Sequence, residues 1–188
     1  MTSTLRQRLT TLTAPLPLPL TDHRKQAAVL IAVFEDEPGY PVLFTRRAER
    51  LRRHGGEICL PGGLMEPGDG GSPVVTALRE TEEELGLTAE RVNVRAVLPP
   101  HDNSDGLRVH PVLAAARRPG TWRPQSREVS GILEVPLRVF DKAGHYRREV
   151  RRYRGIDKET LVLHYRDESI WGLTARIMDG LRQHLNTP

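Results

Sequence analysis

The amino-acid sequence predicts a mixed α/β fold with more strand than helix. Its 188 residues are about the length of one domain. The 38% hydrophobic and 28% charged residues are ordinary values for a globular chain, and they exclude a wholly disordered or disulfide-framework protein. An eight-residue apolar run at 27–34 predicts a buried strand, and the residues around 74–85 carry the start and stop signals of a helix.

Apolar runs and turn residues mark out the first half of the chain. The turn residues at 37–40 separate two strand signals, which we expect to pair as a hairpin. A third apolar piece runs directly into a proline and two glycines. The expected elements are, in order, strands over 27–34, 41–46 and 58–60, and a polar loop over 66–71.

The helix over 74–85 has a signal at each end. Ser72 is a favourable N-cap, Pro73 suits the first helical position, and Gly86 suits the stop. Beyond it, apolar patterning predicts further strands over 92–98, 107–115, 146–153 and 160–165, and a last helix over 169–185. We therefore expect one domain over 26–188, preceded by a variable arm over 1–25 whose prolines break any helix.

The chain shows no signal for a membrane or an oxidising compartment. The apolar run at 27–34 is less than half of the ~20 residues that a membrane-spanning helix needs. Cys59 is the only cysteine, so it cannot form an internal disulfide, and the first residues do not resemble a secretory signal. We expect a cytoplasmic protein.

Three glutamates share one face of the helix over 74–85. At ~100° per residue, Glu80, Glu83 and Glu84 fall within about one-third of the circumference, while Glu82 points elsewhere. Like charges at this spacing repel one another, and a hard divalent cation such as Mg²⁺ would offset that repulsion. The alternative is an acidic solvated face that is partly balanced by Arg79.

The surrounding residues resemble a known family. Gly62 and Gly63, a loop, and then 79–87 (RETEEELGL) are similar to the Nudix box, whose second half reads R-E-U-x-E-E-x-G-U with U aliphatic. Residues 43–63 resemble the additional signature of the coenzyme A pyrophosphatase branch, and 171–176 resemble that branch's last helix. The resemblance implies a Nudix-like α/β/α sandwich with a mixed central sheet.

Several positions depart from the family pattern. Thr81 stands where the box has an aliphatic residue, and Gly71 stands where its first glutamate belongs. The loop between Gly63 and Arg79 is two residues longer than in the family pattern. We expect Asp69 or Glu66 to substitute for the missing carboxylate, which in the family is mainly structural and lies near the arginine.

The resemblance also implies roles for the box residues. Glu80 and Glu84 would bind Mg²⁺ or Mn²⁺ directly, and Glu83 would bind the ion or orient the attacking water. Arg79 belongs with Glu80 and Glu83 to the expected catalytic group. Glu83 is the preferred general base, with Glu80 and Glu128 as alternatives.

The upstream signature implies a substrate with several phosphate groups. Arg47 and Arg52 stand at signature positions and are expected to grip phosphate oxygens, since a guanidinium binds them with a planar fork. Gly62 and Gly63 would let the backbone approach the phosphates. The remaining arginines of this segment, Arg46, Arg50 and Arg53, are interpreted as a solvated basic loop.

Three functions follow as hypotheses. The first is hydrolysis of the pyrophosphate bond of coenzyme A or its acyl derivatives to 3′,5′-ADP and (acyl-)4′-phosphopantetheine. The second is Nudix hydrolysis of ADP-ribose, NADH or a nucleoside triphosphate. The third is a catalytically weak nucleotide-binding module, against which the intact glutamates argue. The arginines of 147–154 are interpreted as a solvated strand face, so nucleic acid is not the expected partner.

Overall fold

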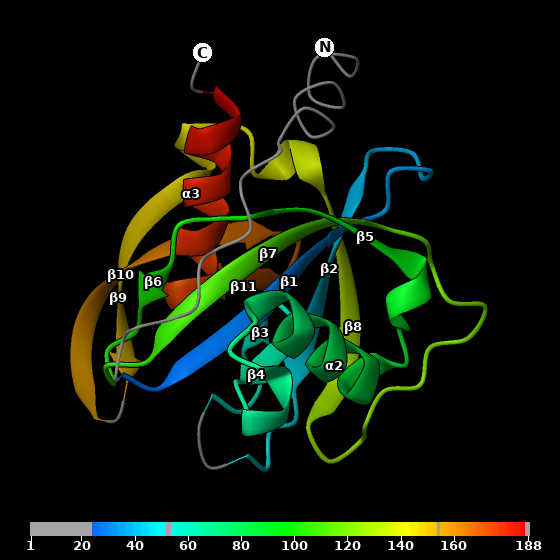
Figure 1. Ribbon diagram of the computed structural model, residues 1–188. Helices are drawn as coiled ribbons and strands as arrows, with labels where there is room; N and C mark the ends of the chain where they lie inside the picture. Colours follow the sequence, from blue (N-terminus) through cyan, green and yellow to red (C-terminus); the bar gives the residue numbers. More distant parts are fainter. Residues whose placement is uncertain (1–23, 52–53, 154, 187–188) are drawn as a thin grey trace.

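A computed structural model describes residues 24–51, 54–153 and 155–186. Its centre is an eight-stranded mixed sheet (Figure 1). Helix α2 (Pro73–Leu85) packs on one face of that sheet, and helix α3 (Gly172–Asn186) packs on the other together with a three-stranded sheet. This arrangement confirms the expected α/β/α sandwich. Among the described residues, no helix combines the length and apolar character needed to cross a bilayer.

The remaining elements are short, and most are strands. The central sheet contains β1 (Gln26–Val33), β2 (Pro41–Arg47), β3 (Ile58–Cys59), β4 (Gly62–Leu64), β5 (Val92–Val97), β6 (His101–Asp102), β7 (Arg108–Ala116) and β8 (Val129–Pro136). The smaller sheet contains β9 (Tyr146–Tyr153), β10 (Ile156–Tyr165) and β11 (Glu168–Trp171). Short 3₁₀ turns are η1 (Pro67–Asp69), η2 (Ala89–Arg91), η3 (Leu137–Val139) and η4 (Ala143–His145).

Strand β1 lies at the middle of the central sheet and is buried on both faces. It pairs in parallel with β7 along its whole length, and successive side chains enter opposite core clusters. Ala28 and Leu30 face α2, whereas Ala27 and Ile31 face α3. Covering on both faces explains why this strand is a continuous apolar run instead of an alternating one.

The first two strands form the expected antiparallel hairpin, but they separate away from the turn. Their recorded register is Val33 opposite Val42, near the turn. Farther along β1, strand β4 takes the neighbouring place, with Gly62 opposite Val29 and Gly63 opposite Ala28. This split brings Gly62 and Gly63, called the glycine turn below, into the central sheet beside α2.

The structure differs from the sequence predictions mainly in the last third of the chain. The predicted strand over 146–153 is confirmed with the same bounds. The predicted start of the last helix at 169 is wrong, because 168–171 pairs with β10 as β11 and buries Ile170 opposite Leu163. Strand β10 begins at Ile156, four residues earlier than predicted, because its first part is exposed and carries no apolar signal. Strand β8 was missed, since Gly131 and polar residues interrupt its apolar pattern.

Candidate active site

The capping residues that the sequence predicts for helix α2 are present at both of its ends. The Ser72 hydroxyl accepts a hydrogen bond from the Val75 N–H at 3.4 Å. At the other end, Gly86 adopts a left-handed conformation with φ of 74°, and its N–H donates to the Glu82 carbonyl at 2.8 Å. Ala77 and Leu85 pack into the core beneath the helix. These contacts fix which way the glutamates of the helix point.

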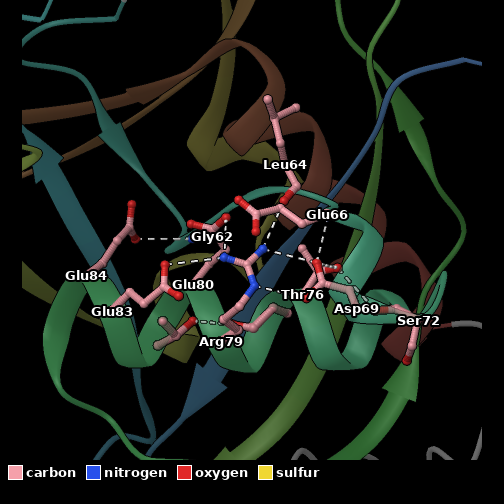
Figure 2. A network of polar contacts seen from close by, with 12 residues as sticks. Gly62, Leu64, Glu66, Asp69, Ser72, Thr76, Arg79, Glu80, Glu83 and Glu84 are labelled. Atoms are coloured by element: carbon pink, nitrogen blue, oxygen red, sulfur yellow. Dashed lines mark hydrogen bonds and ion pairs between the residues drawn. The ribbon is translucent and has the colours of Figure 1, made fainter.

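Two of these glutamates meet the glycine turn. Glu84 is 5% exposed, and its Oε2 accepts a hydrogen bond from the Gly62 N–H at 3.2 Å (Figure 2). The carboxylate of Glu80 lies over Gly63, where an added Cβ would be only 2.4 Å from Glu80 Cδ. Gly62, with φ of 146°, has no room for a Cβ against the β1 backbone. The turn therefore needs glycines to bring strand, turn and carboxylates together.

Burial changes the acidity of these two glutamates. Desolvation raises the pKa of Glu84 to about 7, and the nearby Glu80 carboxylate adds to the rise, while the Gly62 N–H opposes it. Desolvation also raises the pKa of Glu80, with Arg79 acting in the opposite direction. Ionising both Glu80 and Glu84 is therefore costly in the absence of a cation. A bound cation would stabilise their ionised forms.

Arg79 is the centre of a polar network beside these glutamates (Figure 2). Its Nε donates to Asp69 Oδ1 at 2.9 Å, and its Nη2 donates to Asp69 Oδ2 at 3.0 Å. Its Nη1 forms ion pairs with Glu80 at 3.0 Å and with Glu83 at 3.3 Å. One guanidinium therefore links the loop before α2 to two of the predicted site residues.

Asp69 is the buried partner in this network. Its side chain is 2% exposed, and the Arg79 guanidinium holds its pKa at about 2, well below the ordinary value. The same ion pair raises the pKa of Arg79. Of the two carboxylates considered for the missing box glutamate, Asp69 contacts Arg79, whereas Glu66 is exposed and contributes its backbone N–H to Asp69.

The predicted metal ligands are not gathered into a cage. Within the ranges that the structure describes, no three acidic, histidine or cysteine side chains form a group that could hold a metal ion. Glu83 is exposed and paired with Arg79, whereas Glu84 is buried. The adjacent pair Glu80 and Glu84 still fits Mg²⁺, which commonly takes one or two carboxylates and fills its other positions with water and substrate phosphate.

Strand β2 sends its two consecutive arginines to opposite faces of the sheet. Arg46 faces the α3 side, where it pairs with Glu168 and donates to the Gly56 carbonyl at 3.4 Å. Arg47 faces the α2 side, close enough to Glu84 to lower its pKa, and no hydrogen-bond partner is found for its buried Nε among the described residues. Arg52, the other predicted phosphate-binding residue, lies outside the described residues.

Two further residues complete the surroundings of Glu84. Cys59 on β3 contacts Thr45 Oγ1 at 3.2 Å, and burial raises the pKa of its thiol to about 11, so the thiol stays protonated. Glu128, an alternative general base, is close enough to raise the pKa of both Glu80 and Glu84. Its carbonyl accepts the Ala48 N–H at 2.8 Å, which fixes it beside the end of β2.

The sequence analysis missed one residue of this network. Thr76 is fully buried, and its hydroxyl donates to Asp69 Oδ2 at 2.9 Å. A signal for it exists in the sequence, since Ser72, Thr76 and Arg79 follow the four- and three-residue spacing of one helix face. That face is turned toward the loop before α2.

A helix with carboxylates that packs on a mixed sheet beside a glycine turn defines an α/β protein with a candidate cation site. Residues 24–154 match the NUDIX domain. A relative described as an uncharacterized Nudix hydrolase NudL, from Yersinia enterocolitica, is 35% identical over 173 residues, which are 92% of this chain and 87% of that protein. The chain therefore belongs to the Nudix family, whose hydrolases generally need a divalent cation such as Mg²⁺ or Mn²⁺.

Solved structures support the same fold. A MutT/nudix family protein from Enterococcus faecalis superposes with a TM-score of 0.54 at 15% identity, covering 87% of this chain and 62% of that one. An Ap4A hydrolase from C. elegans superposes with a TM-score of 0.51 at 21% identity, covering 60% of this chain and 80% of that one. At these identities the likeness concerns the fold.

Proposed function

We propose that this Nudix hydrolase cleaves the pyrophosphate bond of coenzyme A or its acyl derivatives. The products are 3′,5′-ADP and (acyl-)4′-phosphopantetheine. The observation that carries the proposal is the position of Arg47, which stands at a position of the coenzyme A signature and faces the same side of the sheet as Glu84. Its neighbour Arg46 is turned to the other face and is paired with Glu168.

The guanidinium of Arg47 suits a polyanionic substrate. Its buried Nε has no hydrogen-bond partner among the described residues, and an unpartnered buried donor costs free energy until an acceptor arrives. A phosphate oxygen is such an acceptor, and a guanidinium binds it with a planar fork. Arg47 is therefore the phosphate-binding residue that we propose among the described residues.

The carboxylates have separate proposed roles. Glu80 and Glu84 would hold a Mg²⁺ or Mn²⁺ ion, which when bound favours the ionised form of a water and neutralises charge on a phosphate oxygen. Gly62 keeps Glu84 in place through its N–H, and Gly63 leaves the space that the Glu80 carboxylate occupies. The attacking water loses its proton to a carboxylate and attacks phosphorus, and the bond from phosphorus to the bridging oxygen breaks.

The proton acceptor is proposed to be Glu83, with Glu80 and Glu128 as the other candidates. Glu83 is exposed and lies on the same helix face as the proposed ligands, so a water can reach it. Its pairing with Arg79 at 3.3 Å orients the carboxylate. The backbone carbonyl of Glu128 holds this residue beside β2, and its charge acts on the carboxylates of Glu80 and Glu84.

The test compares substrates and arginine variants with Mg²⁺ or Mn²⁺ present. Wild-type protein is assayed on coenzyme A, acyl derivatives, ADP-ribose, NADH and nucleoside triphosphates, and we expect the highest kcat/KM on coenzyme A or an acyl derivative. Arg47→Lys and Arg47→Ala should lower that value in this order. The loss of a charge-assisted contact is expected to cost about 1.5 to 3 kcal/mol.

Arg46→Lys is the matched control, because it changes an adjacent arginine on the other face and keeps its charge. We expect its kcat/KM to stay near wild type. A larger penalty for Arg47 variants on coenzyme A than on 3′-dephospho-coenzyme A would assign Arg47 to the 3′-phosphate, and equal penalties would assign it to the pyrophosphate. Preference for another substrate, or full activity of Arg47→Ala, would contradict the proposal.

A further inference from the structure

The loop between β2 and β3 folds back on Arg47 and uses both hydrogen-bonding groups of its backbone. The Gly56 N–H donates to the Arg47 carbonyl at 3.0 Å, and the Arg47 N–H donates to the Glu57 carbonyl at 3.0 Å. The residues over 54–57, called the His54 turn below, are closed by the Glu57 N–H, which donates to the His54 carbonyl at 3.3 Å. This turn therefore fixes one edge of β2 at Arg47.

A side-chain contact closes the same turn. His54 Nδ1 lies 2.9 Å from Glu57 Oε2, the distance of a hydrogen bond from the imidazole to the carboxylate. The backbone of His54 has φ of 58°, a left-handed conformation that costs free energy in residues other than glycine. Such a conformation persists where the surroundings hold the residue. The contacts of the His54 side chain therefore keep the turn in this shape.

The smaller sheet holds the His54 ring. Tyr153, the last residue of β9, stacks on the imidazole with ring centroids 5.4 Å apart and ring planes at 25°. Its hydroxyl lies 3.3 Å from His54 Nε2, the ring nitrogen that does not contact Glu57. Strands β10 and β11, which complete this sheet, follow the residues that match the NUDIX domain. A part of the chain outside the matched residues thus supports the loop that contacts Arg47.

We propose that His54 is a positioning residue for Arg47. Tyr153 holds the His54 ring, the ring holds the turn through Glu57, and the turn fixes the backbone that carries the Arg47 guanidinium. The inference rests on the proposed function in taking Arg47 as the phosphate-binding residue, but it requires no particular nucleotide. It makes the orientation of the guanidinium, in addition to its charge, a determinant of substrate affinity.

The orientation of Arg47 matters because of how a guanidinium binds phosphate. Its N–H groups form a planar fork, so two hydrogen bonds form only when this plane faces the phosphate. Without the His54 side chain, the turn and Arg47 would sample more orientations, and the cost of ordering them would reduce substrate affinity. The bound substrate and the transition state carry that cost equally, so KM should rise while kcat stays the same.

The test compares His54→Gly with His54→Asn in the full chain at saturating Mg²⁺, on the nucleotide that wild type hydrolyses with the highest kcat/KM. Glycine accepts the left-handed backbone and removes the side chain, whereas asparagine tolerates that backbone and keeps a side-chain N–H near the place of Nδ1. We expect His54→Gly to raise KM about fivefold, the equivalent of one neutral hydrogen bond, with kcat within about twofold of wild type. His54→Asn should recover part of the affinity. An unchanged KM in His54→Gly would overturn the inference.

Coupling to Arg47 separates positioning from a general loss of structure. In the Arg47→Ala background, His54→Gly should change KM by less than about twofold, because the guanidinium that the turn positions is gone. If the two substitutions instead multiply each other's effect on KM, His54 acts independently of Arg47 and the inference is wrong.

Amide hydrogen exchange, followed by nuclear magnetic resonance, tests the same link without substrate. In His54→Gly, the N–H groups of Arg47 and Gly56 should exchange about fivefold faster than in wild type, because both belong to the contact between turn and strand. The Gly86 N–H, which donates to the Glu82 carbonyl at the end of α2, should keep its rate. Equal acceleration at all three would indicate a loss of global stability, and that result, like unchanged exchange at Arg47, would contradict the inference.

Tyr153→Phe and Tyr146→Phe form a matched pair on β9, and they carry the test if His54→Gly does not fold. Tyr153→Phe keeps the ring on His54 and removes the hydroxyl from Nε2, so KM should rise about twofold. Tyr146→Phe removes a hydroxyl that lies 3.5 Å from the Phe140 carbonyl, at the other end of the strand, and its KM should equal that of wild type. An equal change in both variants, or no change in Tyr153→Phe, would count against the inference.

The outcome for the proposed function can be read separately. If wild type prefers another nucleotide to coenzyme A, the proposed function fails, while the same comparisons on the preferred nucleotide still decide the role of His54. If Arg47→Ala raises KM but the His54 and Tyr153 variants do not, the proposed function stands and the inference fails. A wild-type KM in Arg47→Ala would overturn both.

Discussion

Two regions of the molecule contain the same arginine and aspartate pairing in different surroundings. Beside α2, Arg79 donates to both oxygens of Asp69 at 2.9 and 3.0 Å. On the β9–β10 hairpin, Arg152 donates to both oxygens of Asp157 at 2.8 and 3.2 Å. The geometry is nearly the same. The side chains are 24% and 2% exposed in the first pair but 71% and 55% exposed in the second.

Burial decides what each pair can do. In the interior, the Asp69 carboxylate is removed from water and depends on its partners, so its interaction with Arg79 is strong enough to hold its pKa at about 2. On the hairpin, water and salt already solvate both charges, and exposed pairs contribute about 0 to 1 kcal/mol. The α2 pair therefore positions other groups, while the hairpin pair mainly balances charge.

The β9–β10 hairpin is rich in arginine, and it also contains glutamates that form ion pairs with these arginines. Arg148 pairs with Glu159 across the strands at 3.3 Å, and Arg151 pairs with Glu149 at 2.8 Å. With the Arg152 pair, these contacts balance much of the positive charge locally. They support the interpretation of this cluster as a solvated strand face.

The largest expected effect separates the buried Glu84 of α2 from an exposed glutamate on the same helix. Glu84→Gln should lower kcat by more than the roughly 10- to 100-fold typical for outer-shell partners, because it removes a proposed ligand. The helix should remain intact, since glutamine can still accept the Gly62 N–H and the change removes a costly buried charge. Steady-state hydrolysis with Mg²⁺ and far-ultraviolet circular dichroism provide the measurements.

Glu82→Gln is the control for this prediction. Glu82 is exposed and differs from Glu84 in helix phase, so its activity should stay near wild type. A comparable loss in both variants would show that total charge on the helix matters more than the buried site. Full activity in Glu84→Gln would remove Glu84 from the mechanism.

Much of the fold could be predicted because its signals are local. Ser72, Pro73 and Gly86 bracket α2, and the eight-residue apolar run identifies the doubly covered β1. Strand β8 could not be recognised, since its place depends on pairing with β2, which is distant in sequence. The first part of β10 lies outside the core, so burial leaves no pattern there.

The candidate site shows the same division between local and long-range information. Helical phase correctly separated Glu82 from the buried Glu84. The sequence does not decide between Asp69 and Glu66, because the choice depends on the 3₁₀ turn that points Asp69 at Arg79. Spacing along α2 likewise places three glutamates on one face, but it does not reveal that Glu83 is exposed and pairs with Arg79 while Glu84 is buried against Gly62.

An effect of intermediate size is expected on the free energy of unfolding at low pH. It contrasts the buried Asp69–Arg79 pair with the exposed Asp157–Arg152 pair. The pKa of Asp69 is lowered from 3.8 to about 2 in the folded state. Such a group stabilises the fold fully above its unfolded pKa, and this contribution is lost as pH falls through the folded pKa. Its size at neutral pH is about 2 kcal/mol, with roughly half remaining near pH 3.

Urea unfolding at pH 6 and pH 3 checks this expectation. Wild type should exceed Asp69→Asn in free energy of unfolding at pH 6, and the excess should shrink by about 1 kcal/mol at pH 3. In contrast, the excess of wild type over Asp157→Asn should be small at both values, because that pair is exposed. An excess for Asp69 that does not change with pH would contradict the assigned ion pair.

The smallest expected effect concerns the hairpin pair itself. A double-mutant cycle with Arg152→Ala and Asp157→Ala isolates their interaction from the change in strand propensity that each alanine causes. We expect a coupling of about 0.2 to 1 kcal/mol in 0.1 M NaCl, because both side chains are more than half exposed. In 1 M NaCl the Debye length falls from about 10 Å to about 3 Å, so the coupling should decrease further. A coupling as large as the Asp69 contribution, or one that salt does not reduce, would mean that geometry rather than burial sets the strength of these pairs, and the contrast between the two regions would not hold.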